Sequence, residues 1–295
     1  MSEEKIKVLL DTDIGTDIDD AVCLAYLLAN TRCDLLGITT VTGEPVKRAM
    51  LASAICMRAG KYIPIYPGCS SPILVPQQQK VAAQAIALKT WKHKTSFPRG
   101  EAIEFLRRTI RAHPHEIVLL TIGPLTNIGL LFSVDPEIPS LLKGLTLMCG
   151  YFHRLLPKLG HVEWNAMGDP HATHIVYQAD VKVLCSVGLD VTTSVTMDAK
   201  RFRKVFSRID LFAPILDFSS VWFEEWDGTT FHDPLAATTI FNKDICSFER
   251  GNVRIELDMK ECIGKTYWQS AQNGHHEIAN EVDEEHFFSE YLSVF

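Results

Sequence analysis

Short apolar runs alternate with stretches of helical periodicity over the first two thirds of the chain. The runs, which are typical of buried strands, occupy residues 6–10, 35–41, 63–66, 117–121, 145–149 and 181–187. The helical stretches cover residues 21–29, 45–59, 101–113, 124–132 and 169–179. This order predicts the α/β class, with a mostly parallel open sheet and helices on both of its faces, as in Rossmann-like folds.

The last third of the chain has a weaker pattern. We expect helices and loops over residues 197–231, a strand at residues 253–257, and a polar tail that contains His275-His276. Residues 70–80 are rich in Pro and Gln and are predicted to form a loop. Because no repeat, low-complexity tract or linker interrupts the chain, residues 1–295 are predicted to form a single domain.

Composition limits the partners of this chain. Its formal net charge of -7 and its lack of a basic stripe predict no nucleic-acid partner. No apolar stretch approaches the roughly 20 residues that span a bilayer. The polar N-terminus lacks the apolar core of a signal peptide, so we predict no membrane partner.

The cysteines indicate the redox environment. All eight are scattered without a Cys-x-x-Cys pair, which leaves zinc without a characteristic spacing. Cys23, Cys56 and Cys185 lie in apolar segments, where buried free thiols are expected. These features favour a reducing compartment, and we predict a cytoplasmic protein.

Five carboxylates fall between Asp11 and Asp20, directly after the first apolar run. They therefore lie at the carboxyl end of a predicted strand and the start of a predicted helix, where open α/β sheets bind ligands. A helix N-terminus accommodates one or two carboxylates as caps and dipole partners. A denser group repels itself unless protons or a cation neutralise it. The segment therefore predicts a hard divalent cation with oxygen ligands.

Polar residues also follow other predicted strands. They are Thr42-Gly43-Glu44, Gly123-Pro124-Leu125-Thr126-Asn127 and Glu163-Trp164-Asn165, with His232-Asp233-Pro234 later in the chain. Because the ends of parallel strands share one edge of a sheet, these groups are predicted to share a cleft with the acidic segment. The aromatic-rich residues 222–226 are predicted to form a mobile wall of that cleft.

Each of these polar residues also has a simpler explanation. Thr126 and Asn127 could cap the following helix, and Asp233 could be the N-cap of another. Glu163 and Asn165 could be solvated loop residues. Such explanations must be invoked separately at each place, so their joint occurrence favours a functional site.

These motifs resemble those of the nucleoside hydrolases, the inosine–uridine-preferring N-ribohydrolases. The family fingerprint Asp-x-Asp-x-Gly-x-Asp-Asp-Ala is similar to Asp11-Thr12-Asp13-Ile14-Gly15 followed by Asp19-Asp20-Ala21, with Asp17-Ile18 as an insertion. Further similar segments occur in family order at residues 38–43, 123–128, 163–165, 169–170, 187–192 and 232–236. The resemblance extends over roughly residues 6–270.

The resemblance implies calcium-dependent hydrolysis of the N-glycosidic bond of ribonucleosides, which gives ribose and the free base. The implied Ca²⁺ ligands are Asp13, Asp20, Asp233 and the main-chain carbonyl of Thr126. The ribose 2′- and 3′-hydroxyls would complete the shell, and Asp19, Glu163 and Asn165 would bind ribose hydroxyls. Family members commonly form homodimers or homotetramers, and we expect one of these here.

The same resemblance assigns the acid and the base. Asp13 would deprotonate the water held by the cation, and His232 would protonate the leaving base. A cation lowers the pKa of its water, and carboxylates stabilise positive charge that develops on the sugar. His can donate a proton near pH 7, and we expect neighbouring carboxylates to favour the charged form of His232.

Three departures from the family pattern concern the substrate. Glu44 stands where the family has Asn, and we expect its carboxylate near the sugar. Pro157 stands where the family has a second Asn. The insertion leaves open whether Asp17 or Asp19 faces the sugar. Trp226, or the neighbouring Trp222, is predicted to stack on the base.

Two other functions fit parts of the sequence. Asp11-x-Asp13 after a strand also resembles the haloacid-dehalogenase-like phosphatases, but that fold has Thr or Val where this chain has Gly15, and the expected downstream Lys is missing. A non-catalytic protein that binds calcium and a nucleoside is the other alternative. Glu44 and the missing Asn motivate it, whereas His232 argues against it.

Overall fold

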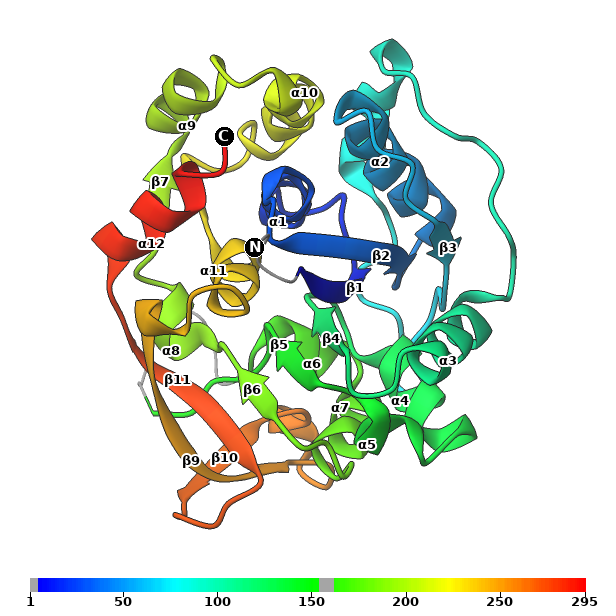
Figure 1. Cartoon of the computed structure of the whole chain (residues 1–295), viewed down its shortest axis with the longest axis vertical. Helices are drawn as coiled ribbons and strands as arrows, with labels where there is room; N and C mark the ends of the chain where they lie inside the picture. Colours follow the sequence, from blue (N-terminus) through cyan, green and yellow to red (C-terminus); the bar gives the residue numbers. More distant parts are fainter. Residues whose placement is uncertain (1–4, 154–161) are drawn as a thin grey trace.

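A nine-stranded sheet runs through the computed structural model, which describes residues 5–153 and 162–295 (Figure 1). The strand order is β10-β9-β11-β6-β5-β4-β1-β2-β3. The strands are β1 Ile6–Thr12, β2 Cys33–Thr40, β3 Ile65–Pro67, β4 Ile117–Thr121, β5 Gly144–Leu147, β6 Leu184–Ser186, β9 Cys246–Ile255, β10 Thr266–Ser270 and β11 His276–Val282. Strands β7 (Thr196–Asp198) and β8 (Gly228–Thr230) form a separate antiparallel pair.

The direction of chain progression reverses at β1. This strand pairs in parallel with β2 on one side and with β4 on the other, so Asp11 lies opposite both Thr39 and Thr121. The chain continues outward to β3 on one side and to β5 and β6 on the other, all in parallel. The loops that follow β1 and β4 therefore leave the sheet side by side at a topological switch point, where open α/β sheets bind ligands.

Helices cover both faces of the sheet. The α-helices are α1 Asp19–Ala29, α2 Pro45–Arg58, α3 Ala102–Ala112, α4 Thr126–Val134, α5 Ile138–Leu141, α6 Trp164–Gly168, α7 Pro170–Tyr177, α8 Leu189–Thr192, α9 Ala199–Phe206, α10 Ala213–Trp222, α11 His232–Thr239 and α12 Glu284–Leu292. The 3-10 helices are η1 Ala83–Thr90, η2 Asp210–Phe212, η3 Lys243–Ile245 and η4 Lys260–Cys262. In Figure 1, α1, α2 and α10 lie on one side of the sheet, and α3, α4 and α7 lie on the other.

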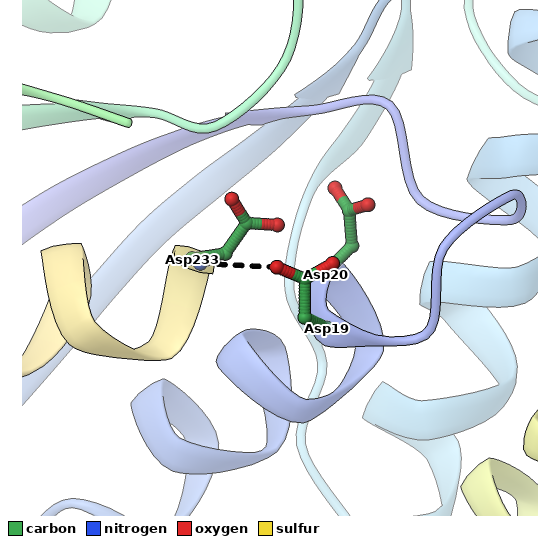
Figure 2. A group of neighbouring side chains, drawn as sticks. All are labelled: Asp19, Asp20 and Asp233. Atoms are coloured by element: carbon green, nitrogen blue, oxygen red, sulfur yellow. Dashed lines mark hydrogen bonds between the residues drawn. The ribbon is translucent and has the colours of Figure 1, made fainter. Parts of the chain in front are cut away.

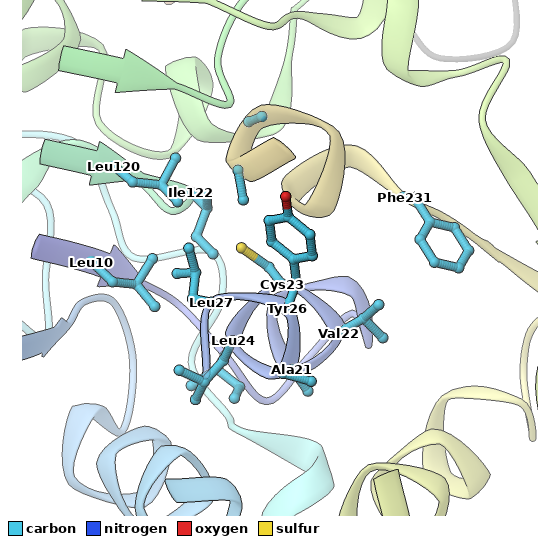
Figure 3. Packing of buried hydrophobic residues seen from close by; sticks show 14 of the residues in the cluster. Leu10, Ala21, Val22, Cys23, Leu24, Tyr26, Leu27, Leu120, Ile122 and Phe231 are labelled. Atoms are coloured by element: carbon cyan, nitrogen blue, oxygen red, sulfur yellow. The ribbon is translucent and has the colours of Figure 1, made fainter. Parts of the chain in front are cut away.

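Two apolar cores result from the alternation of side chains along the buried strands. In β1, Val8 and Leu10 point into the core with α1 and α2, whereas Leu9 points into the core with α3, α4 and α7. Helix α1 is buried on all sides between the sheet, α2 and α11, which explains its continuous run of apolar residues. Figure 3 shows its side chains packed towards Leu10 and Leu120 of the strands.

The structure confirms the α/β class and the mostly parallel sheet. The expected strands and helices up to residue 187 are present, with ends that shift by a few residues, and residues 70–80 form a loop. Cys23, Cys56 and Cys185 are buried, and all eight cysteines are free. That residues 1–295 form one domain stays a prediction, because residues 1–4 and 154–161 lie outside the described part.

The last third differs from its prediction in three places. Strands β7 and β8 lie in the region where only helices and loops were expected. The late strand is longer than expected, and β9, β10 and β11 add an antiparallel edge to the sheet. His276 is not in a polar tail: it lies in β11, is 6% exposed, and its Nδ1 accepts a hydrogen bond from the Val253 amide at 2.9 Å. Pairing between distant segments fixes these strands, and local periodicity does not reveal it.

Within residues 5–153 and 162–295, the structure contains no helix long and apolar enough to cross a membrane.

Candidate metal centre and active site

Three carboxylates from two helix N-termini meet at the switch point of the sheet. Asp19 and Asp20 lie in the first turn of α1, and Asp233 lies in the first turn of α11. One oxygen of each carboxylate lies within 4.8 Å of the others (Figure 2). The Asp233 amide donates a hydrogen bond to Asp19 Oδ2 at 3.1 Å, which joins the two helices. All three side chains are buried.

The loop between β1 and α1 orients this cluster. The hydroxyl of Thr12, the last residue of β1, donates to Asp20 Oδ1 at 2.5 Å and accepts from the Ile14 amide at 3.1 Å. Gly15 has a φ of 120°, a backbone conformation that side-chain-bearing residues rarely adopt. Its turn lets the chain leave β1 and enter α1 within a few residues.

Asp13 lies beside the cluster, at the loop that follows β4. A Cβ atom on Gly123 would lie 2.7 Å from Asp13 Oδ1, so only glycine allows the two loops to approach this closely. The charge of Asp13 raises the pKa of Asp20 and of Asp233, although its oxygens are not part of the group of three. Asp13 is therefore close enough to act together with the cluster.

The pKa values of the cluster are raised. Burial is the largest cause for Asp19, Asp20 and Asp233, and repulsion between neighbouring carboxylates adds to it. Among the described residues, no Lys, Arg or His forms an ion pair with these three carboxylates. A buried, oxygen-only donor set without a cation of its own fits a hard divalent metal ion, because the ion would neutralise the repelling charges.

Helix capping does not explain Asp233, Thr126 or Asn127. Neither α4 nor α11 has a side-chain cap. The Thr126 hydroxyl donates instead to Asp169 Oδ2 at 2.7 Å. The Asn127 amide donates to Asp11 Oδ1 at 2.7 Å, where burial raises the pKa of Asp11 to about 7. These side chains therefore join the start of α4 to the start of α7 and to strand β1.

Glu163, in contrast, is a helix cap. Its carboxylate is the N-cap of α6 and accepts from the amides of Asn165 at 2.7 Å and Ala166 at 2.9 Å. The Gly150 amide adds a third hydrogen bond at 3.1 Å. The Asn165 side chain donates to two carbonyls at the ends of β4 and β5. Both residues are buried at the switch-point edge, and their contact with ribose stays a prediction.

His232 differs from its expected protonation state. Its Nδ1 lies 2.6 Å from Thr192 Oγ1, and the ring is only partly exposed. Burial lowers the pKa of His232 to about 4, so the expectation that carboxylates favour its charged form is wrong. Burial is the only cause of this shift, and it favours a neutral imidazole at pH 7.

Glu44, Trp222 and Trp226 were predicted to contact the substrate, and each of them contacts other residues of the protein. Glu44 forms an ion pair with Lys47 at 2.5 Å and accepts from the Ala82 amide at 3.0 Å. Trp226 is 55% exposed and stacks on Trp222, with ring centroids 5.3 Å apart. Their roles in substrate binding stay predictions.

The insertion and the missing Asn have different outcomes. Asp19 belongs to the carboxylate cluster, whereas Asp17 Oδ1 accepts from the neighbouring Ile18 amide at 2.5 Å. The charge of Asp17 still raises the pKa of Asp19, so both acids lie at the site, and which of them faces the sugar stays open. Pro157 lies outside the described residues.

Sequence reasoning missed two residues that contact Asp13. Arg48 donates to the Asp13 carbonyl, and the Gln79 side chain hydrogen-bonds the Asp13 carboxylate. Arg48 could have been found, because it lies on the face of α2 that Leu51 and Ile55 turn to the core. The loop of Gln79 carries no periodic pattern that could have revealed its contact.

Comparisons with known proteins show what this chain is similar to. The family model for inosine-uridine preferring nucleoside hydrolases matches residues 8–289. Uridine nucleosidase 1 of Arabidopsis thaliana is 26% identical over 279 residues, which cover 88% of this chain and 81% of the relative. The pyrimidine-specific ribonucleoside hydrolase RihB of Escherichia coli is 28% identical over 281 residues, or 89% and 87% of the two chains.

Solved structures show the same fold at lower identity. A purine-preferring ribonucleoside hydrolase from Gardnerella vaginalis superposes with a TM-score of 0.84 and is 21% identical, with 98% of this chain and 97% of that chain covered. A plant nucleoside hydrolase superposes with a TM-score of 0.81 at 22% identity, with 98% of each chain covered. The fold therefore extends over nearly the whole length of each pair.

Proposed function

Because the chain belongs to the inosine-uridine preferring nucleoside hydrolase family, we propose that it is a calcium-dependent ribonucleoside hydrolase whose metal centre lies at the carboxylate cluster that contains Asp20 and Asp233. Membership makes it a hydrolase of N-glycosyl bonds and argues against both the phosphatase and the non-catalytic alternatives. The observation that carries the metal centre is the buried carboxylate cluster without a protein cation.

The proposed ligands are Asp13, Asp20, Asp233 and the main-chain carbonyl of Thr126. Calcium fits this set better than zinc because every donor is an oxygen and no Cys or His takes part. Asp19 joins Asp20 and Asp233 in the cluster, and its remaining oxygen is proposed to bind a ribose hydroxyl. Bound there, Ca²⁺ would neutralise part of the negative charge and hold the water and ribose hydroxyls in place.

Asp13 is the proposed general base. It is buried beside the cluster and can accept the proton of the attacking water as the N-glycosidic bond breaks. A correctly positioned general base typically raises the rate by on the order of 10²–10⁴-fold. The buried carboxylates around it would stabilise the positive charge that develops on the sugar.

His232 is the proposed donor to the leaving base. Its pKa of about 4 means that the free enzyme presents a neutral ring, which still carries one N–H. A hydrogen bond from this N–H would strengthen as negative charge develops on the leaving base, whereas transfer of a whole proton would require the imidazolium form of the ring. Trp226, on the exposed loop before β8, is the proposed stacking partner of the base.

Ribose recognition is proposed for Asp19, Glu163 and Asn165, with Glu44 nearby. The Glu163 carboxylate already accepts three amide hydrogen bonds, so it is held rigidly for one further contact with a hydroxyl. A carboxylate at Glu44 would repel a 5′-phosphate. We therefore expect hydrolysis of inosine to exceed that of its 5′-monophosphate, and a preference for the monophosphate would contradict this role.

Cytoplasmic location and self-association are further proposals. Eight free cysteines suit a reducing compartment. A homodimer or homotetramer is proposed from the family resemblance, and light scattering of the purified protein would distinguish both from a monomer.

The experiment that tests the function is a nucleosidase assay after chelation. We expect release of free base from inosine or uridine to stop when Ca²⁺ is removed and to return when Ca²⁺ is added. Turnover that survives complete chelation would contradict calcium dependence. Full recovery with Zn²⁺ and none with Ca²⁺ would contradict the oxygen-ligand site.

A further inference from the structure

Arg48 is the largest side chain that the structure buries completely, with 0% of it exposed. A buried guanidinium destabilises a fold unless its N–H groups are hydrogen-bonded and its charge is balanced. Arg48 nevertheless has no ion pair with any carboxylate in residues 5–153 and 162–295. Its partners show what it does instead.

The guanidinium donates to backbone carbonyls from three segments. Its Nε donates to Gly43 O at 2.7 Å, one terminal nitrogen donates to Asp13 O and to Ile14 O at 3.1 Å, and the other donates to Val81 O at 3.4 Å. A fifth contact, to Thr16 Oγ1 at 3.3 Å, continues along the acidic loop. One side chain thus connects the loop after β1, the turn after β2 and the segment before η1.

The turn after β2 needs such support. Thr42 and Glu44 have φ values of 69° and 57°, in the left-handed region that residues other than glycine seldom adopt. The backbone at Gly43 also approaches the third segment, since a Cβ there would lie 2.4 Å from Gln79 O. Arg48 follows this turn in the first part of α2 and reaches back to its carbonyl.

We propose that Arg48 is a positioning residue for the hydrolysis, which fixes the backbone of Asp13 and so the direction of its carboxylate. This role rests on the proposed function, in which Asp13 accepts the proton of water. Because Arg48 binds the carbonyl of Asp13 and not its carboxylate, the carboxylate stays available to water and the cation. Lysine could not replace it, because one ammonium nitrogen cannot span three segments as the planar guanidinium does.

The test compares Arg48→Lys with Arg58→Lys, a matched control on the same helix. Arg58 is paired with Asp210 at the surface, far from the carbonyls that Arg48 binds. We expect Arg48→Lys to lower kcat by about 10–100-fold, the usual result of a misplaced reacting group, while KM changes little. The loss in kcat should be equal for inosine and for a nitrophenyl riboside, because hydrolysis of both substrates needs Asp13 as the general base. Arg58→Lys should match the wild type.

Calorimetric titration of the metal-free variants with Ca²⁺ separates positioning from loss of fold. Arg48→Lys should bind as many ions per chain as the wild type, so that its lower kcat belongs to intact sites. The proposal would be overturned if Arg48→Lys kept the wild-type kcat or changed only KM. It would also be overturned if kcat fell only in proportion to the number of Ca²⁺ sites lost.

A second pair of variants applies if Arg48→Lys does not fold. Thr16→Val removes a hydroxyl that accepts hydrogen bonds from Arg48 at 3.3 Å and from Gln79 at 2.6 Å, and Thr16→Ser keeps it. We expect kcat to be several-fold lower in Thr16→Val and close to the wild-type value in Thr16→Ser. Equal kcat values in the two variants would overturn the proposal. Absence of hydrolysis in the wild type would instead refute the proposed function itself.

Discussion

Two groups of buried carboxylates in this molecule have opposite electrostatics. Asp135, at the C-terminal end of α4, is bonded to Arg107 at 2.7 Å and to Arg111 at 2.7 Å, and the Arg111 hydrogen bond is the main cause that lowers its pKa to about 2. The cluster of Asp19, Asp20 and Asp233 is similarly inaccessible to solvent but lies deeper in the molecule, and burial together with mutual repulsion raises its pKa values.

The two groups differ in their depth in the molecule and in their partners. The chain provides two guanidinium groups for Asp135, so this site is complete without a ligand. The cluster at the switch point has no such partner, and Arg48, the nearest buried cation, is directed at backbone carbonyls. An incomplete carboxylate site at the ligand-binding edge of a sheet indicates function, whereas a complete one elsewhere indicates stability.

The largest expected effect concerns Asp13. Asp13→Asn should lower kcat for inosine by roughly 10²–10⁴-fold, because an amide cannot accept the proton of water. Asp13→Ala should abolish turnover, since it removes a proposed metal ligand as well. Asp135→Asn is the matched control and should keep its kcat. A near-normal kcat in Asp13→Asn would show that another group is the base.

The second-largest expected effect concerns His232 and distinguishes the proton donor from the general base Asp13. His232→Ala should slow inosine hydrolysis by on the order of 10²-fold, because the base is a poor leaving group without a proton. A nitrophenyl riboside, whose leaving group needs no proton, should be affected much less. Equal losses on both substrates would mean that His232 positions the sugar or supports the fold.

Removal of the metal should make stability depend on pH in a predictable direction. The cluster has folded-state pKa values above the unfolded ones, and Asp17 shifts from 3.8 to about 7. Its contribution to stability is therefore present below pH 3.8 and is lost as pH rises through the raised values. Urea unfolding of the metal-free protein should show lower stability at pH 8 than at pH 5.

Added Ca²⁺ should oppose this loss. At a free concentration of 100 Kd, binding to the folded state alone stabilises it by about 2.7 kcal/mol. Metal-free protein that is as stable at pH 8 as at pH 5, or unchanged by Ca²⁺, would contradict the contrast between the two groups.

The smallest effect belongs to Asp135. Asp135→Asn should destabilise the fold by roughly 1–2 kcal/mol, since its partners Arg107 and Arg111 are partly exposed and stay hydrated. The pKa of Asp135 is lowered, so its contribution is present above pH 3.8 and is lost as pH falls towards about 2, the reverse of the cluster. The measurement is urea unfolding of wild type and variant at pH 7 and pH 3. A difference that does not shrink at low pH would contradict this assignment.

Local patterns predicted the parts of the fold that local chemistry determines. The parallel strands up to β6 are continuous apolar runs, and the acidic segment after β1 stood out by its charge density alone. Strands β9, β10 and β11 were mostly missed because their sequences lack continuous apolar runs, and β11 joins the sheet by pairing with the distant β6. His276 was placed in a polar tail because the burial of its strand cannot be read from the neighbouring residues.

The sequence identified candidate site residues better than it predicted the interactions that these residues make. The sequence predicted that the acidic segment and Asp233 share one cleft, and the structure brings Asp19, Asp20 and Asp233 together. The predicted ligand set of Asp13, Asp20, Asp233 and the Thr126 carbonyl stays a prediction. The sequence could not predict that burial lowers the pKa of His232, because desolvation depends on packing around the ring. Nor could it predict three amide hydrogen bonds to Glu163, one of which comes from Gly150.

The most direct test of the central claim is anomalous diffraction from crystals grown with Ca²⁺, combined with metal analysis of the protein. The account predicts one strong calcium peak coordinated by oxygens of Asp13, Asp20, Asp233 and the Thr126 carbonyl. A peak that is absent from this cluster at saturating Ca²⁺, or a metal bound instead by Cys or His, would contradict it.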